Sequence, residues 1–409
     1  MQTGRTPVLT PDLLQALRSP EGAALLERAA ALAEEPFAAQ MLRREGAAPE
    51  LAAAAVETAR LRLRARAKFA HADRMWFSGP LLEQSSGELI ARHRARRYAS
   101  WERVGDLCCG LGSDALALTE HAEVVAVDRD PLALALTRAN AAAVGTRHPL
   151  RLLQAELPAG APDVPAAWID PGRREGGTRT RRLEQMSPPF AEVLPLRQRI
   201  PHLGIKLSPA ADHAELDAHL AGLPHEREFL SVRGECRELA LWTGDLAAAR
   251  GTFPRRATLL PAGAELAGEP HPYTEVRPPR GWLLEPDAAV IRAGLVGSLA
   301  DRLGGWGIDP SLAYIGLPAP ADTPFGTLYR VGEPEPFSGK ALSARLRVLR
   351  AGDVVFKTRG AAATPELLRQ QLRGVLKQGG PDIRPVVFVT RLGDRTVMML
   401  GERFGPGTE

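Results

Sequence analysis

Apolar side chains recur at helical spacing through residues 1–100. The runs begin at Thr10-Pro11, Ser19-Pro20 and Ala48-Pro49, and each proline is followed directly by an acidic residue. Proline at the first helical position and an acidic residue in the first turn are typical of helix starts. The pattern therefore predicts an N-terminal helical domain over residues 1–100.

Residues 101–248 alternate short apolar runs with helical stretches. Long, partly helical connections separate the first six runs and favour a doubly wound parallel sheet. Only Arg233 to Glu238 separate the last two, which predicts an antiparallel hairpin. The seven candidate strands are Val104–Cys108, Val124–Val127, Leu150–Leu153, Ala166–Ile169, Gly204–Lys206, Glu228–Val232 and Leu239–Trp242. Together they predict a Rossmann-like, seven-stranded α/β domain.

Prolines interrupt residues 249–324, which are predicted to form an irregular connecting segment with one helix running from Pro286 towards Leu303. Residues 325–409 predict a small α+β domain with the element order β-α-β-α-β-β. Its expected elements are Thr327–Val331, Gly339–Leu349, Val354–Lys357, Pro365–Leu376, Pro385–Thr390 and Thr396–Leu400.

Composition narrows the class of protein. Hydrophobic residues make up 44% of the 409, which is ordinary for a globular chain. No apolar run reaches the roughly 18 residues of a membrane span, and the polar N-terminus lacks a signal-peptide core. Three cysteines give neither a disulfide framework nor zinc spacing. A cytoplasmic protein without a metal site is expected.

Charge adds a hint about the partner. The net charge is +4, the isoelectric point is near 9.2, and basic residues cluster at Arg60 to Lys68, Arg92 to Arg103 and Arg173 to Arg182. Basic clusters favour phosphate backbones, and arginine adds bidentate and stacking contacts. Solvated helix faces are the alternative explanation.

The candidate chemistry starts at a glycine turn. Gly110 and Gly112 follow the first predicted strand, where they allow a sharp turn into a helix and the close approach of a ligand to bare backbone. Asp128 ends the second strand, 16 residues beyond Gly112, where the ribose hydroxyls of a nucleoside ligand are expected. These features indicate a nucleoside cofactor.

Carboxylates around the turn decide between cofactors. Gly110, Gly112 and Ala115 also fit the loose dinucleotide fingerprint G-x-G-x-x-G/A. However, carboxylates at Asp106 and Asp114 would repel a pyrophosphate and suit a ligand with a sulfonium and an α-ammonium group. S-adenosylmethionine carries both, so it is the predicted cofactor. A tight turn without a ligand is the alternative.

The later strand ends complete the predicted site. Glu156 follows the third strand, where it would meet the adenine, and Asp170 follows the fourth, facing the methyl group. Methyl transfer is an in-line displacement that needs alignment of the nucleophile. Asp170 and the peptide oxygen of Pro171 are predicted to accept hydrogen bonds from an N–H nucleophile. Alternatively, Asp128 caps the next helix and Asp170 belongs to a bare turn.

Basic residues beside Asp170 predict an anionic substrate. Arg173 and Arg174 follow it directly and are expected to line the mouth of the site. Lys206 ends a neighbouring strand and is expected to contact a substrate phosphate or to hold Asp170, with a plain surface lysine as the alternative.

These motifs resemble those of bacterial class I SAM-dependent methyltransferases with a C-terminal THUMP-like domain. The resemblance rests first on the motif Asp170-Pro171-Gly172-Arg173-Arg174. The segment Leu82-Glu83-Gln84-Ser85-Ser86 is similar to the one that precedes the catalytic domain of trimethylguanosine-synthase-like enzymes. Two C-terminal signatures, Glu285–Arg292 and Phe356–Gly360, complete it. It implies the class I fold, contacts of Gln84 and Ser85 with the cofactor, and an RNA substrate, because THUMP domains are associated with RNA binding.

The resemblance also bears on the methylated atom. Uracil C5 methylases share an Asp-Pro-Pro-Arg-like motif but need a cysteine nucleophile on a later strand, and the later strand here, Ile205–Pro209, has no cysteine. With the RNA substrate that the resemblance implies, a base nitrogen is the predicted acceptor. A catalytically silent RNA-binding protein and a protein or small-molecule methyltransferase are the alternatives. The predicted cofactor contacts are Asp106, Cys108, Gly110, Gly112, Asp114, Asp128, Arg129, Glu156, Gln84 and Ser85.

Overall fold

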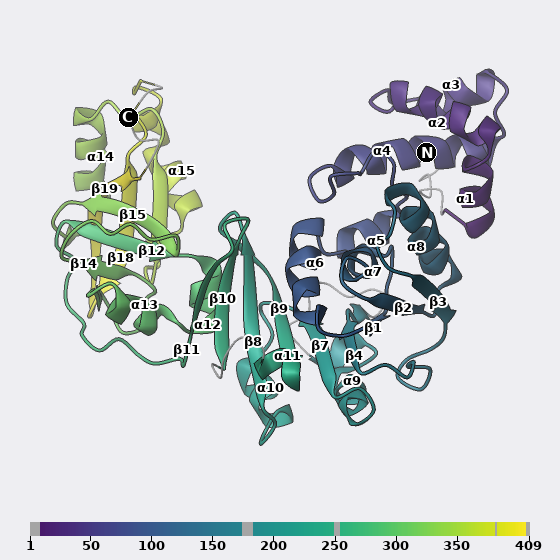
Figure 1. The fold of residues 1–409 in the computed structure, drawn as a ribbon. Helices are drawn as coiled ribbons and strands as arrows, with labels where there is room; N and C mark the ends of the chain where they lie inside the picture. The colour runs from purple at the N-terminus through teal and green to yellow at the C-terminus, as the bar shows by residue number, and fades with distance from the viewer. Residues whose placement is uncertain (1–8, 174–182, 249–253, 381–382, 406–409) are drawn as a thin grey trace. The chain divides into compact units, whose positions relative to one another are not determined.

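The computed structural model describes residues 9–173, 183–248, 254–380 and 383–405 (Figure 1). The chain divides into two compact units. The N-terminal unit comprises residues 1–226 and 239–252, and the C-terminal unit comprises residues 227–238 and 253–409.

Helices α1 to α4 open the N-terminal unit, and they begin where the sequence predicts. The side chains of Thr10 and Ser19 accept hydrogen bonds from the first turns of α1 and α2, whereas Ala48 offers α4 no side-chain acceptor. The four helices share one apolar core with residues of α8. Their bounds are Pro11–Leu17, Pro20–Ala31, Ala38–Arg44 and Pro49–Ala65, and the shorter α5 and α6 follow at Gly79–Gln84 and Glu88–Ala95.

A parallel sheet forms the centre of this unit and confirms the predicted Rossmann-like fold. Its strand order is β7-β4-β1-β2-β3, and β9 adds to β7 in the antiparallel direction. The bounds are β1 Arg103–Leu107, β2 Glu123–Asp128, β3 Leu150–Gln154, β4 Ala166–Ile169, β7 His202–Leu207 and β9 Glu235–Thr243. The chain runs from β1 to one side and returns to the other through β4. Ligands of such sheets bind beyond the carboxyl ends of the strands at this switch point.

Helices α7 and α8 connect the first three strands. They span Ser113–Leu118 and Pro131–Val144, and both contact β2. Short elements make the remaining connections of the unit: β5 Gly172–Arg173, β6 Met186–Ser187, α9 Phe190–Val193, α10 His213–His219 and α11 Asp245–Ala248.

The predicted hairpin exists, but its turn is shorter than expected. Strand β8 spans His225–Val232 and β9 starts at Glu235, so only Arg233 and Gly234 join them. Both residues have a positive φ, of 53° and 86°. Two such residues make the tight turn that matches the twist of paired strands. The predicted loop from Arg233 to Glu238 was therefore too long.

Residues 249–324 are less irregular than predicted. Strand β10 (Arg255–Leu260) pairs in parallel with β8, and β11 (Ala264–Gly268) pairs with β10. The prolines lie outside these strands, at Pro254 and Pro261, where they do not remove a ladder hydrogen bond. The single expected helix is two, α12 (Ala288–Ala293) and α13 (Val296–Arg302), because Gly294 takes a left-handed conformation that ends α12.

The C-terminal sheet has the order β12-β15-β19-β18-β17, with β16 paired to β19. Helices α14 and α15 pack on one face of it, whereas Tyr314 and Ile308 pack on the other. The bounds are β12 Trp282–Pro286, β13 Trp306–Gly307, β14 Ile315–Leu317, β15 Gly326–Val331, β16 Glu335–Pro336, α14 Gly339–Val348, β17 Val355–Arg359, α15 Pro365–Leu376, β18 Val386–Leu392 and β19 Arg395–Phe404. All six elements expected after residue 325 are present.

The two C-terminal sequence signatures meet in this unit. The Glu285 carboxylate accepts from Lys357 Nζ at 2.7 Å and from Arg359 at 3.1 Å. Residues 74 positions apart are joined in this way, which indicates that both signatures stabilise the C-terminal fold.

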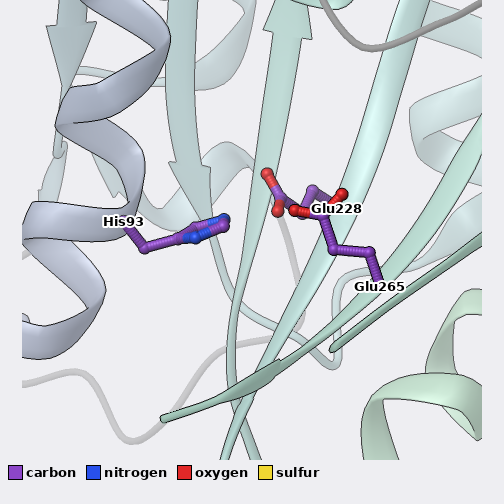
Figure 2. Close-up of side chains that lie close together, drawn as sticks. All are labelled: His93, Glu228 and Glu265. Carbon is purple, nitrogen blue, oxygen red and sulfur yellow. The ribbon is translucent and has the colours of Figure 1, made fainter. Parts of the chain in front are cut away.

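Glu228 and Glu265 form a pair of carboxylates in the C-terminal unit. Their oxygens lie within 4.8 Å of one another (Figure 2, which also labels His93 of the N-terminal unit). Thr258 donates to Glu228 at 2.7 Å, and Arg256 pairs with Glu265 at 2.7 Å. Each carboxylate thus has its own partner on the neighbouring strand β10.

Candidate active site

The glycine turn after β1 has the backbone that the sequence predicts. Gly110 and Gly112 have φ values of 56° and 87°, which few L-residues adopt. A Cβ on Gly112 would lie 2.9 Å from Thr137, and the Thr137 hydroxyl donates to the Gly110 carbonyl at 3.1 Å. Thr137 of α8 therefore packs directly against the turn and leaves no room for a side chain at position 112.

Asp128 ends β2 directly beside this turn. Its two oxygens accept from the amides of Gly110 at 3.0 Å and Asp130 at 2.9 Å. The cap of α8 is Asp130, which accepts from the Leu132 amide at 2.8 Å. The alternative role of Asp128 as the helix cap is therefore wrong. Burial raises the pKa of Asp128 above its ordinary value.

Asp106 is the most isolated carboxylate of the site. It is buried, and within the described residues neither of its oxygens has a hydrogen-bond partner. Burial, together with the nearby charges of Asp114 and Asp170, raises the pKa of Asp106 well above its usual range. A buried acid without a partner favours a cationic ligand at this position.

Asp114 has a partner that the sequence did not reveal. Arg94 of α6 forms a buried ion pair with it, donates to Ser86 Oγ at 3.2 Å and lies 4.2 Å from the centre of the Trp168 ring. The Asp114 charge is therefore already compensated, which corrects our argument that it attracts the cofactor's cations. No local sequence signal marks Arg94, because its partner lies 20 residues away.

Asp170 and Lys206 face each other across the ends of β4 and β7. Lys206 Nζ lies 2.6 Å from Asp170 Oδ2 and 3.2 Å from the Gln84 carbonyl. Of the alternatives for Lys206, the structure shows the contact that holds Asp170. Burial raises the pKa of Asp170, and the Lys206 charge opposes this shift.

The segment Gln84–Ser86 contacts both the start of α7, after the glycine turn, and Lys206, beside Asp170. Ser113, the first residue of α7, donates to the Ser86 carbonyl at 2.8 Å, and Lys206 holds Gln84. The Gln84 side chain is exposed, whereas the Ser85 hydroxyl donates to its own helix at Leu82. The segment therefore lies beside both the glycine turn and Asp170.

Three further predicted residues lie around the turn. Arg129 and Glu156 are exposed and contact each other at 3.4 Å. Cys108 is half-buried in the turn with a φ of 65°, and burial raises the pKa of its thiol. A raised pKa disfavours the thiolate, which is the nucleophilic form of a cysteine side chain.

Several members of the first two basic clusters have partners within the protein. Arg60, Arg62 and Lys68 donate to backbone carbonyls, and Arg97 pairs with buried Glu226. In the third cluster, β5 includes the backbone of Arg173, whose side chain is outside the described residues, as is the whole of Arg174.

Comparisons with known proteins agree with this geometry. Two Mycobacterium tuberculosis proteins, each described as an uncharacterised S-adenosylmethionine-dependent methyltransferase, are 34% identical over 348 residues, which is 83% of this chain and 92% of theirs. A Porphyromonas gingivalis structure described as a methyltransferase has the same fold, with a TM-score of 0.75, 22% identity and coverage of 93% of this chain and 98% of that one. Residues 326–403 match the family "THUMP domain-like", and residues 10–65 match a domain of unknown function (DUF8688).

The chain belongs to the S-adenosylmethionine-dependent methyltransferases. Its predicted enzyme class, its cofactor and its THUMP-like C-terminal domain are thereby confirmed. The turn fits this cofactor, since Asp106 is an unpartnered buried acid and a Cβ would fill the space at Gly112. In the part of the chain that the structure describes, no helix is long and apolar enough to cross a membrane.

Proposed function

We propose that this methyltransferase methylates RNA at a base nitrogen. The observation that carries the RNA assignment is the charge of the helical layer in the C-terminal unit. Helices α14 and α15 expose five basic side chains against one acidic side chain, Glu366, and one of the five, Arg345, is paired with Glu335 of β16. The basic residues are Lys340, Arg345, Arg347, Arg369 and Arg373. A basic face of this kind suits a phosphate backbone, and the THUMP-like match over the same helices implies the same partner.

The proposed roles in the site follow from the charges and contacts described above. Asp106, Asp128, the glycine turn and segment Gln84–Ser86 would hold S-adenosylmethionine, which supplies an electrophilic methyl group when bound. Asp128 retains lone pairs for ribose hydroxyls, because each carboxylate oxygen can accept two hydrogen bonds. Cys108, Arg129 and Glu156 are proposed as outer contacts of the same ligand.

All three cysteines are free, which suits the cytoplasm as the proposed compartment.

Asp170 is the proposed acceptor-binding group. Lys206 takes Oδ2, whereas within the described residues Oδ1 has no partner, so it remains available for an N–H of the substrate. The Pro171 carbonyl is proposed as a second acceptor. These contacts would align the nucleophile's lone pair without removing its proton before attack. Arg173 and Arg174 are proposed to bind an adjacent phosphate.

Lys206 should set the pH dependence of this step. Its charge opposes the raised pKa of Asp170, so Lys206→Met is expected to raise that pKa further. If ionised Asp170 is the active form, the acid limb of the kcat/KM profile then moves to higher pH. Lys206→Arg keeps a cation and should leave the limb near its original position. A Lys206→Met profile that is lower but unmoved would contradict this role.

The RNA assignment predicts where labelled methyl groups appear. The protein, incubated with methyl-labelled S-adenosylmethionine and total bacterial RNA lacking the modification, is expected to label RNA. Digestion to nucleosides should then place the label on a base nitrogen. Label found only in protein or small acids would show that the substrate is not RNA, and no transfer despite cofactor binding would favour a catalytically silent protein.

Reversing the charge of two arginines on α14 and α15 tests whether the basic face of these helices binds RNA. Arg347→Glu with Arg373→Glu should weaken RNA binding and reduce the slope of log affinity against log salt by about 1.4, since each phosphate contact to single strands contributes about 0.7. Arg43→Glu with Arg44→Glu makes the same charge change on exposed positions of α3 and should leave the slope unchanged. Equal effects of the two pairs would argue against this surface.

A further inference from the structure

A cleft of about 440 Å³ lies among the N-terminal helices, apart from the glycine turn. The C-terminal end of α1 and one side of α2 form one wall, α4 and Trp76 a second, and the C-terminal end of α8 a third. Its lining is mostly apolar and includes Leu17, Leu26, Trp76 and Ala142. The volume lies within the range of about 300–1,000 Å³ that small-molecule sites occupy.

The cleft contains one cation that is poorly compensated. Arg62 lies 4.9 Å from the Trp76 ring centre and uses its Nε to donate to the Met75 carbonyl at 2.9 Å. Among the described residues Arg62 has no ion pair. The nearest acid that influences it, Asp73, is already paired with Arg66 at 2.9 Å. The remaining Arg62 donors are therefore available to an anion.

The rim of the cleft contributes one positive and one negative side chain and therefore no net charge. Arg18 and Glu27 line the cleft, and both are exposed. They oppose each other, so the charge of Arg62 decides the preference of the interior. A half-buried guanidinium between apolar walls favours a ligand with one anionic group on an apolar body, because each part of the ligand meets its complement.

We propose that this cleft is a binding site for a small amphipathic anion, with the anionic group on Arg62 and the apolar body against Trp76 and Ala142. The ligand class is defined by the volume, the lining and the single uncompensated cation. The site is separate from the methyl-transfer chemistry, so its test needs neither S-adenosylmethionine nor RNA.

The test uses the full chain and anilinonaphthalene sulfonate, a fluorescent probe with one anionic group on an aromatic body. Saturable binding is expected. Arg62→Met should weaken it by about tenfold or more, since a hydrogen bond to a charged group is lost. Ala142→Trp, at an exposed helix position, should fill the cleft and abolish binding without disturbing the packing of the core. Decanoate should displace the probe, whereas decanol should not.

Matched variants control for changes outside the cleft. Arg64→Met removes an exposed arginine of the same helix, and Ala24→Trp adds the same bulk to an exposed position on α2; neither residue lines the cleft. Both should bind the probe like the unchanged protein. The proposal is wrong if the probe does not bind saturably, if Arg62→Met and Ala142→Trp bind it undiminished, or if decanol competes as well as decanoate.

Discussion

Replacing Asp170 with asparagine is expected to lower the methyl-transfer rate by about 10²–10⁴-fold, the range for a positioned acid–base group. Asparagine keeps the size of the side chain but removes the charge. It also cannot both accept from Lys206 and offer a carboxylate oxygen to the substrate. The affinity for S-adenosylmethionine should change only a few-fold, because the proposed cofactor contacts lie on other strands. Single-turnover kinetics and calorimetric titration measure the two effects separately.

Asp163→Asn is the matched control for this variant. Asp163 is exposed and lies shortly before β4, so the same chemical change there should leave both the rate and the affinity intact. A normal rate in Asp170→Asn would remove Asp170 from the mechanism. A loss of cofactor affinity as large as the loss of rate would show that Asp170 binds S-adenosylmethionine and not the methyl acceptor.

Replacing Asp128 with alanine is expected to reduce the affinity for S-adenosylmethionine by about 10²–10⁴-fold. The variant would lose two hydrogen bonds from ribose hydroxyls to a charged group, each equivalent to about one to two powers of ten in affinity. It would also release the amide of Gly110 from Asp128 Oδ2, so the turn itself would lose support. Calorimetric titration measures the loss.

Two companion variants separate binding from folding. Asp128→Asn retains an acceptor for the Gly110 amide and loses the one for the Asp130 amide. It should therefore support the turn better than Asp128→Ala, while still binding the cofactor more weakly than the unchanged protein. Asp130→Ala removes the cap of α8 and should cost about 1 kcal/mol of unfolding free energy without a comparable loss of affinity. Unchanged cofactor binding in Asp128→Ala would refute the ribose contact.

Many helices and strands could be predicted because their signals are local. The starts of α1, α2 and α4 follow from a proline and its neighbours, and α15 has the predicted bounds Pro365–Leu376. Apolar runs located the strands of the parallel sheet for the same reason. Each of these signals lies within a few residues of the element that it marks.

The errors arose where a local signal had two explanations. Prolines in residues 249–324 indicated irregular chain, yet Pro254 and Pro261 merely flank β10. The hairpin loop was predicted too long because Arg233, which has the positive φ of a tight turn, is not a typical residue for that conformation. Strand pairing decides both cases, and pairing is not visible in a single segment.

The sequence by itself determined the glycine turn, the acids at the strand ends and hence the cofactor class, because these residues depend on local backbone and on position within a strand. Only the tertiary structure decided how their charges are balanced. Arg94 neutralises Asp114 across 20 residues, and Lys206 reaches Asp170 across 36 and Gln84 across 122. Such contacts depend on which strands and helices become neighbours, and packing of the whole unit sets that arrangement.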